Sequence, residues 1–340
     1  MHQTATAPQE SGAPIDEIEA LLTKFPLHYT WNYEMVRQEL TNLYEKAKRD
    51  QWNASEHLDW TTPVDPESEL IPDFQIPIYG THIWDKLTPG EVKKLRRESL
   101  SWSLSQFMHG EQGALLATAQ IVDATPTIES KFYAATQVMD EARHVEVYAR
   151  YLHEKLTRQY PCNRHLKTLL DQILTDSRWD MKNLGMQIMV EGLAKAAFGF
   201  MHKTCNEPQL KDLTHNVMRD ESRHVAFGVL SLTDYYCDMP ANELKDREDF
   251  LIYACELSRD RLIGDQIADA MGWNREEVRQ TVLASPPFRD FRRSLFMRIV
   301  PNLKRLGLLS PRVREAFTRL GILEFENADP EAQDRALGLG

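Results

Sequence analysis

Two six-residue stretches decide the fold: DEARHV at residues 140–145 and DESRHV at residues 220–225. The two stretches are identical at five of six positions and are displaced by eighty residues. The same displacement relates Glu111, within the segment GEQGA, to Glu191, within the segment VEGLA. Because a motif and a separate glutamate recur at one displacement, the sequence predicts a helix pair followed by its repeat.

The repeated motif places a glutamate and a histidine three residues apart. Side chains at positions i and i+3 of a helix lie on one face, so Glu141 projects beside His144, and Glu221 beside His224. The other two glutamates of the repeat stand among apolar residues. An isolated buried carboxylate costs roughly several kcal/mol or more, whereas four carboxylates balance the charge of two divalent cations. The sequence therefore predicts a buried site for two metal ions.

The predicted ligand set mixes carboxylate oxygen with imidazole nitrogen. This mixture suits iron or manganese better than zinc, which favours thiolate or imidazole, or calcium, which takes oxygen alone. One Glu-x-x-His is common on solvated helix faces, but two copies that share a displacement with two further glutamates are difficult to obtain by chance. We expect two iron ions bridged by Glu141 and Glu221, with manganese an alternative at one site. The six expected ligands are Glu111, Glu141, His144, Glu191, Glu221 and His224.

The composition of the 340-residue chain limits its partners. The 51 acidic and 40 basic side chains give a formal net charge of -11, which argues against binding to nucleic acid or to anionic membranes. The sequence has neither a signal-peptide pattern nor a run of apolar residues long enough to span a membrane, so we expect a cytoplasmic protein. The four cysteines form no Cys-x-x-Cys pair and fit neither a disulfide framework nor a thiolate metal site.

Helical periodicity dominates the chain and no long stretch alternates with period two, so the predicted fold class is all-α. Start signals for helices are present at Thr88, at Thr125 and at Asn206. Long helices are expected over 89–122, 126–157, 165–204 and 207–237, and shorter ones over 33–52, 241–270, 274–284, 289–306 and 311–320. The expected regions are a flexible arm over 1–25, a helical and irregular wrap over 26–88, a bundle over 89–237, and helices over 238–340 that pack on the bundle.

Residues 89–237 resemble the ferritin-like carboxylate-bridged di-iron superfamily, in which two single glutamates and two Glu-x-x-His motifs line a four-helix core. The Asp-Glu-x-Arg-His form is similar to that of bacterial multicomponent monooxygenases, acyl-carrier-protein desaturases and ribonucleotide reductase radical subunits. In those families the aspartate supports a metal-binding histidine, which implies that Asp220 supports His144 and that Asp140 supports His224. Such a carboxylate orients the imidazole ring and fixes its tautomer.

Three positions distinguish the chemistries of this superfamily. Tyr148 takes the place of the radical tyrosine of ribonucleotide reductase small subunits, but a packing role is favoured because the first ligand is Glu111 rather than aspartate. Lys195 stands where hydrocarbon hydroxylases carry a threonine, and pairing with an acid is favoured there over binding an anionic substrate. Arylamine N-oxygenases of the superfamily bring a further histidine four residues before the last ligating glutamate. This chain has Val217 there, and His215 lies on a different face.

The resemblance implies a non-haem di-iron oxidoreductase that uses O2 to hydroxylate, N-oxygenate or desaturate a small organic substrate. Electrons are expected from an external reductase or ferredoxin, and analogy with the superfamily implies a homodimer. Two alternatives stay open: a radical-generating subunit, and an iron-storage bundle, which the long segments on both sides of the bundle disfavour. The walls of the substrate pocket are expected from the first and third long helices, at Phe107, Met108, Leu115, Gln187, Ala194 and Phe198.

Overall fold

The computed structural model describes residues 19–65, 67–156 and 158–336. Within these residues the regular elements are α-helices and short 3-10 or π segments, without any strand. The predicted all-α class is therefore confirmed. Of the arm predicted over residues 1–25, the first eighteen residues lie outside the described part of the chain.

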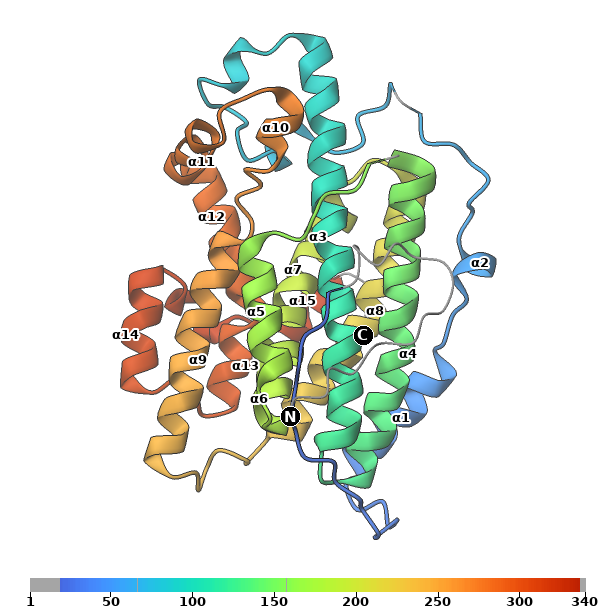
Figure 1. Ribbon diagram of the computed structural model, residues 1–340, viewed down its shortest axis with the longest axis vertical. Coiled ribbons are helices and arrows are strands. Elements are labelled where there is room, and N and C mark those ends of the chain that lie inside the picture. Colours follow the sequence, from blue (N-terminus) through green and yellow to red (C-terminus); the bar gives the residue numbers. More distant parts are fainter. Residues whose placement is uncertain (1–18, 66, 157, 337–340) are drawn as a thin grey trace, which may run out of the picture.

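The core is a bundle of four helical rods. The first rod is α3 (Pro89–Ala124), and the second is α4 (Ile128–Tyr151) continued by the π segment η4 (Leu152–Leu156). The third rod consists of three consecutive elements, namely α6 (Trp179–Asn183), the π segment η5 (Leu184–Val190) and α7 (Glu191–Thr204). The fourth rod is α8 (Pro208–Leu232). α3 packs along α4, α7 packs along α8, and α4 also contacts α8, so the two predicted helix pairs meet in one bundle (Figure 1).

Shorter helices surround the bundle, and those from the C-terminal part of the chain cover one side of it (Figure 1). The chain that precedes the bundle forms α1 (Gln38–Arg49), α2 (Ala54–His57), η2 (Asp73–Gln75) and η3 (Trp84–Lys86). The segment of chain that connects the second rod to the third contains α5 (Arg164–Thr175). After the bundle follow α9 (Ala241–Asp260), α10 (Ile267–Met271), α11 (Arg275–Ala284), α12 (Pro286–Ser294), η6 (Leu295–Arg298), α13 (Val300–Arg305), α14 (Pro311–Leu320), η7 (Leu323–Asn327) and α15 (Pro330–Ala336). The helices predicted over 241–270 and 289–306 are thus each divided.

The first and last rods begin with side-chain caps, one of which differs from the prediction. At α3, the Thr88 hydroxyl accepts from the Glu91 amide and the Glu91 carboxylate accepts from the Thr88 amide, which is the predicted capping box. The predicted cap of α8 at Asn206 is wrong. Glu207 accepts from two free amides of the first turn, while Asn206 Nδ2 donates to the Glu69 carbonyl at 2.9 Å and so holds the preceding wrap.

The single long helix predicted over residues 165–204 is interrupted between α5 and α6. Asp176 accepts a hydrogen bond from the Arg178 backbone amide at 2.8 Å, and such a turn competes with helical hydrogen bonding. The chain resumes as a helix at Trp179 and passes through the π segment η5 directly before Glu191. π segments are rare, occur mostly as bulges inside α-helices, and are frequent at functional sites.

The segment before the bundle follows the bundle surface. The His28 amide donates to the Asp123 carbonyl at 2.9 Å, the Arg37 amide donates to Glu129 Oε1 at 2.9 Å, and α1 packs on both α4 and α8. This course brings Gln51 and Trp52, which follow α1, against the middle of the bundle.

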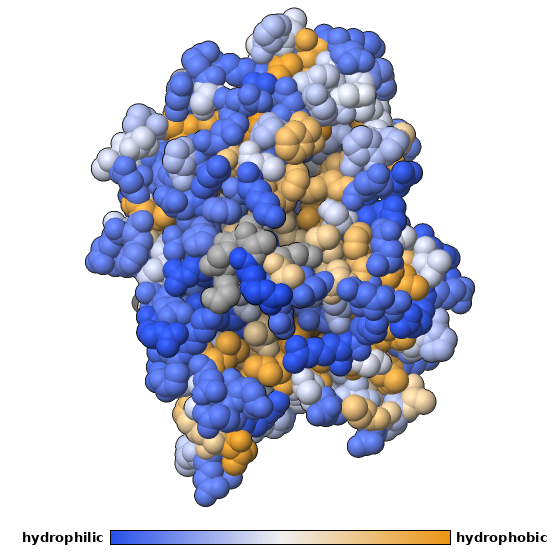
Figure 2. Space-filling view, turned by 180° about the vertical axis from the view of Figure 1, so that it is seen from behind, coloured by the Kyte–Doolittle hydropathy of each residue, from blue (hydrophilic) through white to orange (hydrophobic). Residues whose placement is uncertain are grey.

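Hydrophilic residues cover most of the face seen in Figure 2, and apolar residues gather there in several separate areas. None of the helices in the described part of the chain is both long and apolar enough to cross a bilayer.

Candidate metal centre

The structure brings all six predicted ligands together in the middle of the bundle. Each of the six is almost completely buried, with at most 5% of its surface exposed. Their donor atoms form two groups that could each hold a cation. The first group contains Glu111, Glu141, His144 and Glu221, and the second contains Glu141, Glu191 and His224.

The first group is centred on His144 Nδ1. This atom lies 3.4 Å from Glu111 Oε2, 3.4 Å from Glu141 Oε2 and 3.3 Å from Glu221 Oε1. Glu111 comes from α3, Glu141 and His144 come from α4, and Glu221 comes from α8. Three of the four rods therefore meet at this group.

Two carboxylates connect the groups. Glu141 presents Oε2 to His144 and Oε1 to His224, whose Nδ1 lies 3.1 Å away. Glu221 Oε1 lies between the two imidazoles, at 3.3 Å from His144 Nδ1 and 3.5 Å from His224 Nδ1. Both carboxylates therefore lie within reach of both histidines, and their assignment as bridges stays a prediction.

The donor set fits a pair of cations. Glu141 Oε2, Glu191 Oε2, both oxygens of Glu221, and His224 Nδ1 are buried and have no hydrogen-bond partner among the described residues. Buried polar atoms are almost always satisfied, so a cluster of unpartnered electron-pair donors that face one another requires an explanation. Divalent cations accept these electron pairs and balance the carboxylate charge at the same time.

Two aspartates cross between the helix pairs to hold the histidines. Asp220 Oδ2 lies 3.1 Å from His144 Nε2, and Asp140 Oδ2 lies 3.3 Å from His224 Nε2. Because a carboxylate only accepts, each Nε2 that faces an aspartate carries a proton, and each Nδ1 faces the cluster, where it would offer its lone pair to a bound cation. These are the partners that the resemblance implies.

The aspartates belong to a buried ionic network. Arg143 Nη2 donates to Asp220 Oδ2 at 2.9 Å and also contacts Asp140, while Arg223 Nη2 donates to Asp220 Oδ1 at 2.5 Å and to Asp140 Oδ2 at 3.3 Å. Each aspartate thus contacts both arginines. The two carboxylates stay charged and fixed in place beneath the histidines.

Sequence reasoning missed two residues that complete this network. Trp52 Nε1 donates to Asp220 Oδ2 at 2.8 Å, and Gln51 Nε2 donates to Asp140 Oδ1 at 2.9 Å. Both residues precede the bundle by many positions, and no pattern in the sequence links them to the motif. The wrap therefore contributes directly to the support of both histidines.

The electrostatics of the cluster favour the uptake of positive charge. Burial raises the pKa of Glu111 and of Glu191 well above the usual range, and the nearby Glu221 adds to this rise. Burial acts on Glu141 in the same direction, but the charge and hydrogen bonds of His224 and His144 hold the pKa of Glu141 below its usual value. The carboxylates outnumber the imidazoles, so the cluster attracts protons or metal cations.

Comparison with known proteins identifies the family. The model of the family described as P-aminobenzoate N-oxygenase AurF matches residues 34–307, which is most of the chain and includes all six clustered side chains. The protein belongs to the AurF family. Together with the buried carboxylate–histidine cluster, this makes it an oxidase or oxygenase of the ferritin-like di-iron class.

Solved structures similar to this AurF-family chain include variants of an R2-like ligand-binding oxidase. A variant with an aerobically reconstituted Mn/Fe cofactor is 19% identical, covers 80% of this chain and 93% of its own, and has a TM-score of 0.48. Another variant, with an anaerobically reconstituted Mn/Fe cofactor, is 21% identical, covers 75% and 92%, and has a TM-score of 0.44. No curated protein matches the chain.

The AurF-family chain departs from the arylamine N-oxygenase pattern at Val217. Val217 is completely buried within an apolar cluster and offers no donor atom. His215, two residues earlier, packs against His202 with the ring centroids 5.4 Å apart. The cluster therefore contains six carboxylate and imidazole side chains.

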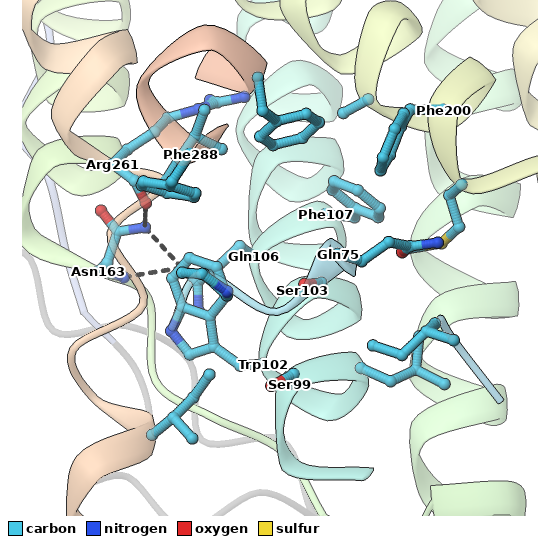
Figure 3. Close-up of a pocket in the computed structure, with 18 residues that line it drawn as sticks. Gln75, Ser99, Trp102, Ser103, Gln106, Phe107, Asn163, Phe200, Arg261 and Phe288 are labelled. Carbon is cyan, nitrogen blue, oxygen red and sulfur yellow. Dashed lines mark hydrogen bonds between the residues drawn. The ribbon is translucent and has the colours of Figure 1, made fainter. Parts of the chain in front are cut away.

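A cavity lies along the part of α3 that precedes Glu111 (Figure 3). Aromatic side chains line much of it, namely Trp102, Phe107, Phe200, Phe288 and Phe291. Phe107 is one helical turn before Glu111 on α3, so this wall leads toward the first group of donors. Figure 3 shows Asn163 hydrogen-bonded to Gln106 and to the Arg261 carbonyl at one side of the cavity.

Only Phe107 of the six predicted pocket residues lines this cavity. Phe198 contacts the Phe107 ring at a centroid distance of 4.6 Å. Met108 and Gln187 are buried elsewhere, while Leu115 and Ala194 are partly exposed. The prediction used proximity to the ligands along the first and third long helices, whereas the cavity also takes walls from η2, α10 and α12.

Tyr148 and Lys195 are two residues for which the sequence left more than one role open. The Tyr148 ring packs 5.9 Å from the rings of Phe107 and Phe198, and its buried hydroxyl has no partner among the described residues. Lys195 Nζ pairs with Asp334 Oδ2 at 2.5 Å, which is the favoured pairing with an acid.

Proposed function

We propose that the protein binds two iron ions in the six-residue cluster and catalyses the O2-dependent N-oxygenation of a small aromatic amine that carries a carboxylate. The family description supports the reaction type and the class of substrate. The single observation that carries the assignment to this chain is Arg261. Its side chain lines the aromatic cavity, is about nine-tenths buried, and forms no ion pair among the described residues.

An unpaired buried guanidinium is an anchor for an anion. Burial lowers the pKa of Arg261 to about 10, so the group still carries its charge near neutral pH. Burying an uncompensated charge is costly, and a bound carboxylate would remove most of that cost through charge-assisted hydrogen bonds. The aromatic walls provide flat apolar surfaces against which a benzene ring can pack.

The residues that would hold the iron are those of the two donor groups. Glu141 and Glu221 would bridge, Glu111 and His144 would complete the first site, and Glu191 and His224 would belong to the second. Bound iron supplies the redox chemistry that activates O2. The chain itself directs both Nδ1 atoms inward through Asp140 and Asp220, and keeps bulk water from the cluster by burial.

The reaction requires an electron donor from outside the chain. Conversion of an amine to a hydroxylamine inserts one atom of O2 into an N–H bond. Two electrons and two protons reduce the other atom to water. The described cysteines are unpaired thiols and supply no dithiol for this purpose, so we propose an external reductase or ferredoxin as the partner.

The metal assignment is tested by loading the protein with ferrous iron without oxygen and then adding O2. A spin-coupled diferric centre at two irons per chain, detected by Mössbauer spectroscopy, is the expected result. Persistence of isolated ferric ions, or a stoichiometry far from two, would contradict the dinuclear site. A long-lived Tyr148 radical would instead support the radical-generating alternative, and uptake of hundreds of irons per particle would support storage.

The substrate assignment is tested with Arg261→Met and two amines, 4-aminobenzoate and aniline. We expect the variant to raise KM for 4-aminobenzoate about tenfold or more, corresponding to about 1.4 kcal/mol, because the carboxylate loses its partner. KM for aniline should change little. Equal effects on the two amines would show that Arg261 does not recognise the carboxylate.

A further inference from the structure

A groove rich in arginine lies among the helices that follow the bundle in the chain. Its walls come from the end of α9, from α11, α12 and η6, and from the end of α14 with the turn after it. Although the whole chain has a formal net charge of -11, the groove gathers positive charge. The arginines that line it are Arg259, Arg279, Arg289, Arg292, Arg293 and Arg319. Among the described residues that line the groove, Asp260 is the one acidic side chain.

Four of these arginines hold carboxylates of the chain itself. The ion pairs are Arg259–Asp260, Arg289–Asp290, Arg293–Glu324 and Arg319–Glu315. All four arginine side chains are partly or largely exposed, so each charge is neutralised locally and near solvent. The two arginines that remain are Arg279 and Arg292.

Arg292 is buried in the wall of the groove, with 5% of its surface exposed. Its Nη1 donates to the Arg259 carbonyl at 3.4 Å, and its Nε is buried with no hydrogen-bond partner among the described residues. Asp260 Oδ1 lies 4.0 Å from Nη1, but Arg259 already holds both oxygens of Asp260, at 2.7 and 2.9 Å. The Phe288 ring, 5.0 Å away, offsets only part of the cost of burying a charge. Arg292 therefore lacks a carboxylate of its own.

Arg279, on α11, also lines the groove and forms no ion pair among the described residues. Two guanidinium groups without a closely held carboxylate call for about two negative charges. A carboxylate would supply one, whereas a phosphate group carries about −1.5 to −2 at pH 7 and has three strong acceptor oxygens. The planar fork of arginine matches such oxygens in pairs. Leu283 and Leu320 add apolar surface to the groove, which suits the carbon part of a phosphate ester.

The groove shares a helix with the aromatic cavity. On α12, Phe288 and Phe291 line the cavity, where Figure 3 shows Phe288. Arg289, Arg292 and Arg293 of the same helix line the groove. A ligand in the groove would therefore contact a helix that forms a wall of the cavity, without entering the cavity itself.

We propose that this groove is a second ligand site, which binds an anion that carries a phosphate group, either free phosphate or a phosphate ester. Arg279 and Arg292 would bind the phosphate oxygens, and the exposed arginines would attract the anion. The inference goes beyond the proposed function and does not depend on it, because the lining of the groove includes neither Arg261 nor any of the six clustered carboxylate and imidazole side chains.

The test measures the binding of inorganic phosphate and of butyl phosphate to the iron-loaded protein, by isothermal titration calorimetry at constant ionic strength. Arg292→Met and Arg279→Met remove the proposed contacts. Arg261→Met removes the arginine that lines the aromatic cavity but not the groove. Arg312→Met is the control for the loss of one positive charge, because Arg312 is an exposed residue of α14 that does not line the groove.

We expect the wild-type protein, Arg261→Met and Arg312→Met to bind phosphate with equal affinity. Arg292→Met and Arg279→Met should each bind it about tenfold more weakly or worse, because each loses charge-assisted hydrogen bonds. Tighter binding of butyl phosphate than of inorganic phosphate would identify the ligand as a phosphate ester, and equal binding would identify free phosphate. Thermal unfolding without ligand checks that each variant is folded.

Other results would overturn the proposal. One is the absence of binding to the wild-type protein at millimolar phosphate. Loss of affinity in Arg261→Met but not in Arg292→Met would place the phosphate in the aromatic cavity, and equal affinity in every variant would place it at the iron or elsewhere. An equal loss in Arg312→Met would show a general effect of charge. If Arg292→Met does not fold, the partly exposed Arg279 still decides the question.

Discussion

The two helix pairs of the bundle carry the same candidate metal ligands in different surroundings. Each pair contributes one single glutamate, one Glu-x-x-His, and one aspartate that supports the histidine of the other pair. Around this frame, the positions related by eighty residues differ. Phe107 corresponds to Gln187, Leu115 to Lys195, Gln137 to Val217, and Tyr148 to Gly228.

These substitutions give the two sides of the cluster different roles. On the side of the first pair, Phe107 lines the cavity and its ring packs against that of Tyr148. On the side of the second pair, Gly228 lets η5 approach α8 so closely that a Cβ atom at position 228 would lie 2.5 Å from Gln187 Cβ. The repeat thus preserves the carboxylate and imidazole side chains of the cluster, while the residues packed around them differ between the two pairs.

The largest expected effect comes from removing a ligand that both donor groups share. Glu141→Ala should reduce the iron content from two per chain to nearly none, because Glu141 belongs to both groups. Glu111→Ala and Glu191→Ala should each keep about one iron, because each belongs to one group only. Iron per folded chain, measured after dialysis, checks this order. Retention of one tightly bound iron by Glu141→Ala would show that the groups are independent.

The frame of ligands could be predicted from the sequence because it is local. The i, i+3 spacing fixes Glu141 beside His144 whatever the rest of the chain does, and the repeat supplies the opposite half. The same rule places Gln137 on the face of Glu141, and its Nε2 donates to Glu141 Oε1 and to Glu191 Oε1. The support from Gln51 and Trp52 was not predictable, because those contacts span 89 and 168 residues.

The interruption between α5 and α6 has another cause. The residues around Asp176 are compatible with a helix by periodicity, but the hydrogen bond from the Arg178 amide to the Asp176 side chain stabilises a turn there instead. The cavity was missed for a tertiary reason. Its walls include Gln75, Arg261 and Phe288, which come from segments before and after the bundle. Helical periodicity within one rod contains no information about such convergence.

A smaller effect is expected where the second pair is closely packed. Gly228→Ala should destabilise the protein by about 1–3 kcal/mol, because the new Cβ would overlap Gln187. Gly110→Ala is the matched control on α3, where a Cβ atom would meet nothing within 4 Å. There the gain in helix propensity should stabilise the protein by up to about 1 kcal/mol. Urea unfolding of the metal-free proteins measures both changes, and a Gly228→Ala variant as stable as wild type would contradict the packing difference.

The smallest effect is expected at Lys195, whose counterpart in the first helix pair is Leu115. Burial lowers the pKa of Lys195 from 10.5 to about 8, although Asp334 opposes this shift. Between these two pH values the unfolded chain holds the proton that the folded protein has lost. The contribution of Lys195 to the free energy of unfolding therefore rises as pH increases from about 8 to about 10.5.

Lys195→Leu makes the second pair resemble the first at this position and removes that dependence. Asp334 keeps Arg298 as a partner at 2.5 Å, so its carboxylate is not left unpaired. We expect the stability of the variant to lie within about 1 kcal/mol of wild type at pH 7. Its unfolding free energy should rise less steeply than that of wild type between pH 8 and pH 10, as measured by urea titrations at several pH values. Identical slopes would mean that Lys195 keeps its ordinary pKa, and that the second pair tolerates a charged lysine one turn from Glu191 without penalty.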